Sequence, residues 1–166
     1  QQPQEYFNVT DYPPLRSTDK KGIKINYIST SQLPPETLTE KRKTETGYIT
    51  VSNPILTAID LVNYEKRIGG LNRAATVINE LAESIKSKDV KEEFIKYASV
   101  SSLQRLGFIL EEILDKKIIA DKIFSLCKKQ ETQFYVIPLK ASGEKNRSIL
   151  NEKWKIMVNT KIEIDL

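Results

Sequence analysis

One stretch of the chain, Gly47 to Ile85, carries the full set of signals for a strand followed by two helices. Its first residues, Tyr48 to Val51, are aromatic and β-branched, the types that suit a half-buried strand. Ser52-Asn53-Pro54 then predicts a helix start, because a Ser or Asn side chain caps free N–H groups and proline fits the first turn. The glycine pair at 69 and 70 predicts the end of that helix, since glycine adopts a left-handed conformation without strain.

Both predicted helices of this stretch carry apolar residues at helical spacing, so each should bury at least one face. The first has Ile55, Leu56, Ala58, Ile59, Leu61 and Val62, and the second has Leu71, Ala74, Ala75, Ile78, Leu81, Ala82 and Ile85. None of these side chains is chemically reactive. We therefore expect the stretch to be a scaffold and not a reaction centre.

The rest of the chain has strand patterns at both ends and helical patterns in the middle. Three further helices are expected over 90–98, 103–113 and 118–129, the first of them with Asp89 as its N-cap. Strands are expected over 6–9, 23–28, 134–139, 154–158 and 162–166, and a loop over 17–21. The pattern predicts an α+β fold, with about five helices packed on a mixed or antiparallel sheet formed by the N- and C-terminal strands.

The length of 166 residues fits one domain. We expect residues 1–46 to form its N-terminal arm and first strands, and residues 47–166 to form its main body. Because the chain opens with Gln and not Met, we expect it to be part of a longer product. No apolar run approaches the roughly 20 residues of a membrane-spanning helix, so we expect no membrane contact.

Composition excludes several catalytic classes. The chain has no histidine and one cysteine, Cys127, which excludes Ser-His and Cys-His pairs, internal disulfides and Cys-based zinc sites. It contains neither G-x-x-x-x-G-K-[ST] nor G-x-G-x-x-G, the two nucleotide-binding fingerprints. Cys127 continues an apolar stripe, which favours a buried structural thiol, and a single free cysteine fits a reducing cytoplasm. We expect a protein that is not an enzyme and has no catalytic residue, cofactor or metal site.

Carboxylates leave one enzymatic alternative open. They are Glu111, Glu112 and Asp115 at the end of the fourth predicted helix, and Asp60 and Glu65 on the first. Two carboxylates with a lysine could hold Mg²⁺ in a nuclease-like site. The other interpretation is a solvated helix edge, balanced by the lysines at 116 and 117.

Positive charge is concentrated in two places. The segment from Lys140 to Lys161 has six basic and two acidic residues, an excess equal to the net charge of +4 of the whole chain. Lys41-Arg42-Lys43 forms a second basic cluster just before the predicted strand. Either segment can attract phosphates or an acidic partner, and either can be an ordinary solvated surface, which for 41–43 means an exposed loop.

Four runs of residues together resemble a known family. They are I-T-V-S-N-P-I-L-T-A-I-D-L at 49–61, the glycines at 69–70, L-Q-R-L-G-F-I-L-E at 103–111 and N-R-S-I-L-N-E-K-W-K-I-M-V-N at 146–159. In order and spacing they look like the C-terminal domain of AbiEi-type antitoxins, from type IV toxin–antitoxin and abortive-infection systems. Ser52, Pro54, Thr57 and Asp60 match the first motif of that family, whereas Ile55-Leu56 replaces its common Glu-Arg pair, so a role tied to that pair does not carry over. Within the third run, the glycine at 107 indicates a tight helix crossing.

The resemblance implies an antitoxin that neutralises a nucleotidyltransferase-like toxin and helps to repress its own operon by binding operator DNA. Such antitoxins usually have an N-terminal winged helix, which we expect this chain to lack because no compact basic three-helix unit precedes Gly47. Stable complexes with the toxin are often not seen in type IV systems. The candidate residues for nucleic-acid or partner binding are Arg105, Lys140, Lys145, Arg147, Lys153, Lys155, Lys41, Arg42 and Lys43. Two alternatives stay open: a small Mg²⁺-dependent nuclease that uses Glu111, and a protein-interaction module that binds no DNA.

Overall fold

The computed structural model describes residues 17–20, 22–28, 30, 32–142 and 149–164. The chain divides into two compact units, Gln1–Leu33 and Pro34–Leu166. In the first unit, β1 (Thr18–Lys20) and β2 (Ile23–Ile25) form an antiparallel hairpin. β1 corrects the expectation of a loop over 17–21, because its residues pair with β2 across a tight turn. The strand expected over 6–9 lies outside the described residues.

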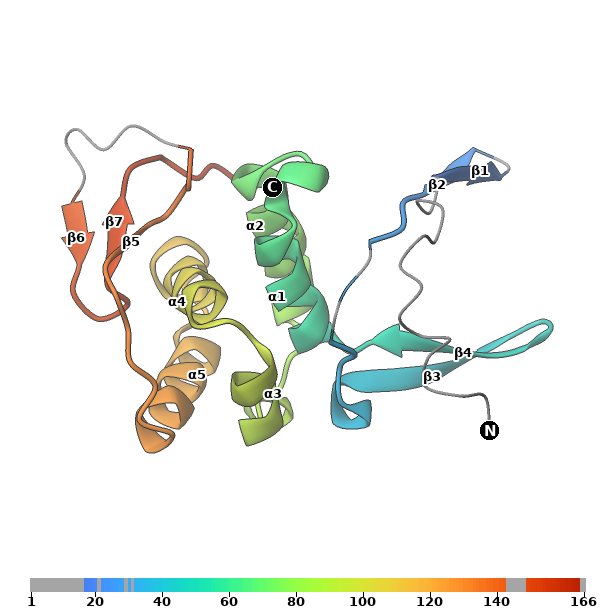
Figure 1. Cartoon of the computed structure of the whole chain (residues 1–166), viewed down its shortest axis with the longest axis horizontal. Helices are drawn as coiled ribbons and strands as arrows, with labels where there is room; N and C mark the ends of the chain where they lie inside the picture. Colours follow the sequence, from blue (N-terminus) through green and yellow to red (C-terminus); the bar gives the residue numbers. More distant parts are fainter. Residues whose placement is uncertain (1–16, 21, 29, 31, 143–148, 165–166) are drawn as a thin grey trace, which may run out of the picture. The chain divides into compact units, whose positions relative to one another are not determined.

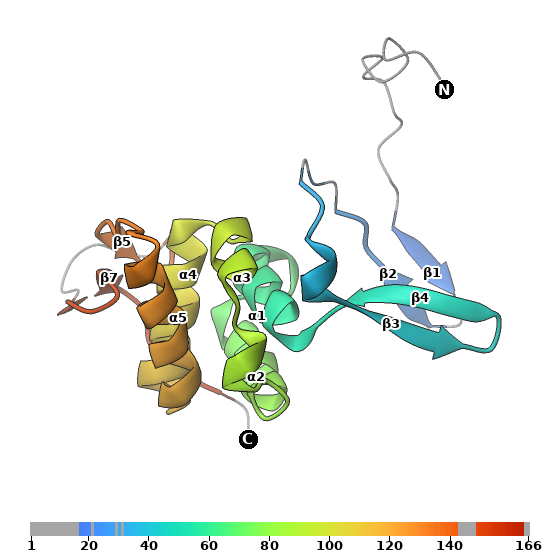
Figure 2. The same ribbon diagram turned by 90° about the horizontal axis from the view of Figure 1, so that it is seen from below.

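The described part of the second unit is built on five α-helices, which form the middle of the chain as expected (Figure 1). They are α1 (Pro54–Asn63), α2 (Leu71–Ala82), α3 (Glu92–Tyr97), α4 (Val100–Phe108) and α5 (Lys117–Lys129). α4 continues into a π-helical turn over Ile109–Ile113. α1 packs beside α2, and α4 beside α5, so that their apolar faces form one core (Figure 2). No helix in the described ranges is long and apolar enough to cross a membrane.

Two small sheets complete the second unit. β3 (Thr39–Thr44) and β4 (Gly47–Ser52) form an antiparallel hairpin that leads directly into α1. β5 (Ile137–Pro138), β6 (Ile149–Asn151) and β7 (Ile156–Val158) form a mixed sheet in the order β5-β7-β6. β5 runs parallel to β7, and β6 runs antiparallel to it. The expected α+β class, with antiparallel and mixed sheets, is confirmed, but the described N- and C-terminal strands lie in separate sheets because each pairs with near neighbours in the sequence.

The start of α1 has the capping that the sequence predicts. The backbone N–H of Leu56 donates to Oδ1 of Asn53 at 3.0 Å, and Pro54 occupies the first helical position. The backbone N–H of Asn53 in turn donates to the carbonyl of Leu38 at 2.9 Å. Leu38 ends the 3-10 turn Glu36–Leu38 and is fully buried, so the helix start is tied to the core.

The end of α1 differs from the prediction. The helix ends at Asn63, and a 3-10 turn, Glu65–Arg67, separates it from the glycine pair. Gly69 and Gly70 have φ values of 102° and 95°, a conformation that favours glycine. The pair therefore turns the chain into α2 instead of ending α1, because the tightening from α to 3-10 geometry has already ended the helix.

Two further local predictions are wrong. Asp89 lies in a 3-10 turn, Ser87–Asp89, where its carboxylate accepts the N–H of Lys86 at 2.9 Å, and it does not cap α3. The basic run Lys41–Lys43 lies in β3 and not in a loop, because the pairing with β4 extends through it. These side chains are nevertheless exposed, as expected.

The C-terminal strands are shorter than the alternating pattern predicts. Of residues 134–139, only Ile137–Pro138 pairs as a strand, and it lies at the edge of its sheet, where a proline is tolerated. Residues 162–164 form no strand, although Ile162 is buried. Each segment buries an apolar residue, Leu139 or Ile162, while its backbone has few strand partners, which alternation alone cannot reveal.

Trp154 belongs to the core of the second unit and is fully buried. The ring of Phe124, from α5, meets it edge-on at a centroid distance of 5.3 Å, and Phe134 stacks at 5.9 Å. Gly107 of α4 lies against the same ring. The close packing expected at this glycine is present, with a tryptophan and not another helix as the neighbour. Cys127 is buried, as expected.

Candidate functional site

Arg105 joins α4 to the end of β5. Its Nε donates to the carbonyls of Pro138 (3.2 Å) and Leu139 (3.1 Å), and its Nη2 donates to Pro138 at 3.2 Å. Partial burial lowers the pKa of Arg105, and the nearby charge of Glu65 acts in the opposite direction. A guanidinium remains charged in proteins, so a fixed cation stands at this position.

Lys140 follows directly after this anchored segment. Its backbone is clamped by Asn159: the Lys140 N–H donates to Oδ1 at 3.0 Å, and Nδ2 donates to the Lys140 carbonyl at 2.9 Å. The Lys140 side chain is exposed. Arg105 and Lys140 therefore lie at the same end of the β5–β7 pair, and Asn159, the last residue of the tail motif, fixes that end.

Lys153 is held by its own protein. Its Nζ lies 2.8 Å from the Glu111 carboxylate and 2.7 Å from Asp121, and it also lies over the ring of Phe124 at 5.1 Å. Partial burial lowers the pKa of Lys153, but hydrogen bonds to Asp121 and Glu111 outweigh that effect and raise the pKa above its ordinary value. The Trp154 Nε1–H donates to the same Glu111 carboxylate at 2.6 Å. Lys153 and Glu111 thus stabilise the buried tryptophan.

The other basic residues of the C-terminal segment are less constrained. Lys155 pairs with Glu152 at 2.6 Å and is partly exposed, while its backbone carbonyl accepts the N–H of Ile137 at 3.0 Å. Lys145 and Arg147 lie outside the described residues. Lys155 is therefore adjacent to the start of β5, whereas Lys140 lies just beyond its end.

The β3–β4 hairpin separates the three basic residues of the N-terminal cluster onto two faces. Successive side chains of a strand alternate, and the register pairs Lys41 with Thr50 and Lys43 with Tyr48 on one face. Arg42 lies on the other face, opposite Ile49, and forms an ion pair with Glu40 at 2.6 Å. We call the face with Lys41, Lys43, Tyr48 and Thr50 the lysine face. It carries two lysines and no carboxylate from either strand.

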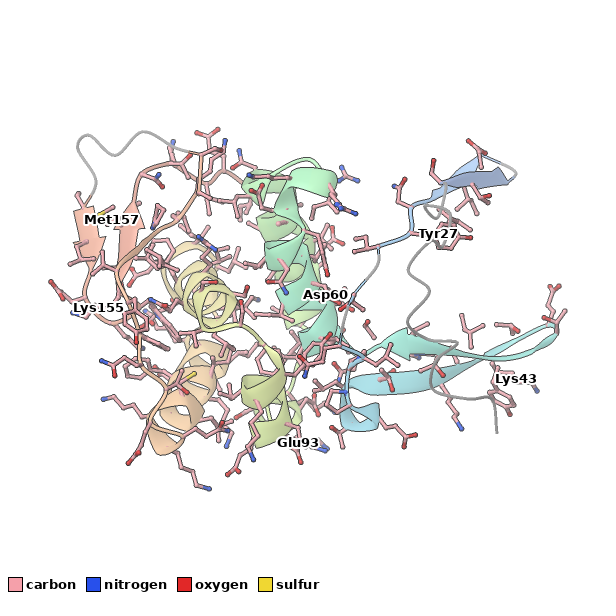
Figure 3. The ribbon with its side chains drawn as sticks, in the orientation of Figure 1. Tyr27, Lys43, Asp60, Glu93, Lys155 and Met157 are labelled. Atoms are coloured by element: carbon pink, nitrogen blue, oxygen red, sulfur yellow. The ribbon has the colours of Figure 1, made fainter. Side chains whose placement is uncertain are left out.

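The candidate cations thus fall into two groups. Arg105, Lys140 and Lys155 lie around the β5–β7 pair, and Lys153 is engaged by carboxylates in the same region. Lys41 to Lys43 lie on the hairpin, with the helices between the two groups (Figure 3). The separation into a C-terminal group and the 41–43 cluster follows the two concentrations of charge in the sequence.

The clustered carboxylates each have a partner of their own. Those partners are Trp154 and Lys153 for Glu111, Asn151 for Glu112 at 2.9 Å, and Lys117 for Asp115 at 3.0 Å. Within the described ranges, no group of three or more His, Cys, Asp or Glu side chains is placed to hold a metal ion. Glu65 lies on the 3-10 turn after α1 and not on α1 itself.

Thr57 and Asp60, two residues of the first family motif, lie on α1. The Thr57 hydroxyl donates to the carbonyl of the capping Asn53 at 3.0 Å. One turn later, Asp60 is partly buried on α1, and burial raises the pKa of its carboxyl from 3.8 to about 6. The pKa of Tyr97 is raised by burial and, to a smaller extent, by the charge of Asp60 and by Tyr64. The environment of Asp60 therefore disfavours its charged form.

Sequence reasoning missed three residues that the structure makes prominent. Lys66 and Arg67, on the 3-10 turn after α1, line the same cavity as Arg105. Gln104 is buried and donates from Nε2 to the carbonyls of Tyr135 and Trp154, both at 2.7 Å. The sequence signal for Lys66 and Arg67 is that they form a basic pair just before the glycines. Nothing in the sequence places this pair near Arg105. Gln104 stands between Leu103 and Arg105 in the third motif, and nothing in that local sequence indicates that its amide is buried.

Comparison with known proteins supports the first three of the four motifs, whereas the fourth, at 146–159, lies outside the matched residues. The family model described as the AbiEi antitoxin C-terminal domain matches residues 24–112, which is more than half of the chain. No curated protein and no solved structure gives a significant match. The match spans β3, β4 and α1 to α4, and so includes Thr57, Asp60, Arg105 and Gly107. The chain belongs to the AbiEi antitoxin C-terminal domain family.

Proposed function

We propose that the chain acts as the antitoxin of a type IV toxin–antitoxin system and neutralises a nucleotidyltransferase-like toxin in abortive infection and phage defence. The observation that carries this proposal is the family match over residues 24–112. The partners of Glu111, Glu112 and Asp115 favour structural roles for these carboxylates, so we propose no enzymatic activity.

We also propose that the protein contacts operator DNA and contributes to control of its own operon. Two basic regions support this: the lysine face of the β3–β4 hairpin, and Lys140 with Lys155 around the β5–β7 pair. Lysine and arginine side chains that neutralise phosphates supply most non-specific affinity for DNA. Lys153 contributes less, since Glu111 and Asp121 already neutralise it. The two partners, toxin and operator, place the proposed action in the cytoplasm.

Co-expression with a toxin tests the antitoxin role. The full-length protein and a nucleotidyltransferase-like toxin encoded beside its gene are expressed from separate inducible promoters, and growth is followed. We expect growth that the toxin alone arrests to be restored. An inactive toxin variant controls for the burden of expression. Growth that stays arrested while the protein is present in folded form would overturn the proposal.

Two assays separate the alternatives. A pull-down that recovers a stable protein partner, with no binding to duplex DNA, would favour a pure interaction module. Mg²⁺-dependent cleavage of nucleic acid that disappears in Glu111→Gln would favour a nuclease. The antitoxin proposal expects DNA binding without cleavage, and it does not require a stable complex with the toxin.

A further inference from the structure

A cavity of about 300 Å³ lies where the end of α1, the 3-10 turn Glu65–Arg67, the start of α2, α4 and the segment after β5 meet. Its polar lining residues are Asn63, Tyr64, Glu65, Lys66, Arg67 and Arg105. The volume is at the lower end of the roughly 300–1,000 Å³ of small-molecule sites. It suits a ligand of a few polar groups.

Arg105 is the fixed cation of this cavity. A guanidinium has five N–H donors, and the recorded hydrogen bonds use the one on Nε and one on Nη2. Three N–H donors therefore have no acceptor among the described residues. Because two backbone carbonyls hold the side chain, its orientation is set before any ligand binds, which reduces the entropy lost on binding. A partly buried cation that is not paired with an anion is unfavourable, so a site of this kind favours an anionic ligand.

Two further cations line the cavity. Lys66 and Arg67 are exposed residues that line the cavity with Arg105, and Glu65 is the one carboxylate of the lining. Across the described residues, none of the three cations forms an ion pair with a carboxylate. The lining thus has an excess of two positive charges, which matches a doubly charged anion.

The remaining lining adds polar and aromatic groups. On the α1 side of the cavity, Tyr64 offers a ring, and Asn63, whose amide oxygen accepts from the Ser102 hydroxyl, offers its NH₂ group. Leu71, the first residue of α2, also lines it, and that helix has no side-chain cap at its N-terminus. Free N–H groups at a helix start attract negative charge, in the same direction as the three cations.

We propose that this cavity binds a phosphate monoester, with Arg105, Lys66 and Arg67 on the phosphate and Tyr64 and Asn63 beside its organic part. Arginine matches phosphate oxygens through its planar fork, and a phosphate monoester carries nearly two negative charges at neutral pH. The ligand is either a free nucleotide or the terminal phosphate of a nucleic-acid strand. The site is separate from the hairpin and does not depend on operator binding.

The test is a titration of the full chain with 5′-AMP, followed by two-dimensional NMR and calorimetry. We expect amide shifts at residues 63–71 and 105, weaker binding of inorganic phosphate and no binding of adenosine. Lys66→Gln/Arg67→Gln should raise the Kd roughly tenfold or more, because two charge-assisted contacts are lost. The matched control is Lys86→Gln/Lys88→Gln, which also removes two exposed positive charges but from residues that do not line the cavity.

Arg105→Lys tests whether the planar guanidinium, and not only its positive charge, is needed for binding. It keeps a cation at the site and should weaken 5′-AMP more than it weakens a non-specific anion such as sulfate. The source of the phosphate is identified with a 5′-phosphorylated oligonucleotide, its 5′-hydroxyl form and AMP. If the phosphorylated oligonucleotide binds more tightly than both of the others, the ligand is a strand end. If it binds more weakly than AMP, the ligand is a free nucleotide. No binding of AMP, equal binding of AMP and adenosine, or equal losses in the test and control pairs would overturn the proposal. None of these results bears on rescue from the toxin.

Discussion

The ring of Trp154 occupies the space in which a side chain at position 107 would stand. A Cβ built on Gly107 would lie 2.1 Å from Cη2 of Trp154 and 2.5 Å from its Cε3. The tryptophan is itself fixed by its hydrogen bond to Glu111 and by the rings of Phe124 and Phe134. One glycine on α4 therefore determines how the C-terminal segment packs on the helices.

Gly107→Ala is expected to destabilise the fold despite the better helix propensity of alanine. Alanine gains about 1 kcal/mol in a helix, whereas the displacement of a fully buried ring costs more than ordinary overpacking of about 1–3 kcal/mol. We expect a net loss of about 2 kcal/mol and a Tm lower by about 4–8 °C. Thermal and urea unfolding measure both quantities.

A second variant identifies the cause. Trp154→Phe provides a smaller ring, so Gly107→Ala should be much less harmful in that background than in the wild type. The difference is the coupling free energy between the two sites in a double-mutant cycle. Additive effects would mean that the loss in Gly107→Ala comes from somewhere other than the contact with Trp154.

Glu111→Gln is expected to lower stability through the tryptophan. The amide oxygen can still accept the Trp154 Nε1–H, but the ion pair with Lys153 is lost, and both charged side chains are mostly buried, with 16% and 27% exposed. Removal of one partner from a buried ion pair is costly, but Lys153 keeps its contact with Asp121 at 2.7 Å and both side chains are partly exposed, so we expect a loss of only about 1–2 kcal/mol. Urea unfolding, monitored by the fluorescence of this single tryptophan, gives the value. Glu112→Gln is the matched control, because it makes the same change at the exposed neighbour that contacts Asn151 and not Trp154, and it should have a smaller effect.

The helical scaffold could be predicted from sequence because its signals are local. The Asn53-Pro54 start of α1, the apolar stripe of α2 and the cations at the end of α5 all depend on neighbours within a few residues. The predicted end of α1, at the glycine pair, was wrong. The helix ends earlier because hydrogen bonds stabilise a 3-10 turn at Glu65–Arg67, and apolar periodicity does not indicate such bonds. The lengths of the C-terminal strands were overestimated for a related reason. An alternating segment becomes a strand only where a neighbouring strand pairs with its backbone.

The candidate site was only partly predictable. Sequence identified Arg105, but not that it would share a cavity with Lys66 and Arg67, which lie nearly forty residues earlier. It placed Lys153 with the free cations, although Glu111 and Asp121 engage it. Such juxtapositions come from tertiary packing, which a single sequence does not display. The position of Arg42 on the opposite face from Lys41 and Lys43 could have been predicted, because side chains alternate along a strand. That prediction would have needed a strand over 41–43, where the charge run suggested a loop.

Asp60→Asn is expected to stabilise the protein at neutral pH. Burial raises the pKa of this carboxyl from 3.8 to about 6, so the folded state binds the proton more tightly than the unfolded state. The stability that the protonated group contributes is present below pH 3.8 and is lost as the pH rises through about 6. Asn removes that loss, and solvent screening limits the gain at pH 7 to about 1 kcal/mol.

Measurement of unfolding free energy from pH 4 to pH 7 checks this prediction. The wild type should lose stability relative to Asp60→Asn as the pH rises through this window. Glu80→Gln, an exposed carboxylate on α2, is the control and should follow the wild type. Parallel curves for Asp60→Asn and the wild type would contradict the assigned cause. If Asp60→Asn also fails to rescue growth while it is more stable, the residue serves the antitoxin function at the expense of stability.

Cys127 is expected to be unreactive in the folded protein. It is 1% exposed, and burial raises the pKa of its thiol from 9.0 to about 11. The pKa shift alone lowers the thiolate fraction near pH 8 by about 100-fold, and the thiolate is the reactive form. Ellman's reagent should therefore react slowly without urea and at once in denaturing urea. Ser125→Cys/Cys127→Ala moves the thiol to an exposed position on the same helix and should react rapidly under both conditions.

The two faces of the β3–β4 hairpin give the sharpest test of DNA contact. Lys41→Gln, Arg42→Gln and Lys43→Gln each remove one positive charge from three successive residues, but only the two lysines share the lysine face. A two-stranded ribbon fits the major groove of DNA. Each phosphate contact contributes about 0.9 to the slope of log Kobs against log salt concentration, so Lys41→Gln and Lys43→Gln should each reduce the slope by about that amount.

Arg42→Gln is the matched control, because its guanidinium is already neutralised by Glu40 on the opposite face. It should leave the slope unchanged, whereas Tyr48→Ala should weaken binding without a change in slope, since it removes contact area and no charge. Fluorescence anisotropy with operator-containing duplex, over a series of salt concentrations, measures all four variants. Equal slopes for the three charge variants would mean that net charge and not the lysine face governs binding. Unchanged slopes in the lysine variants would instead move the DNA contact to Lys140 and Lys155.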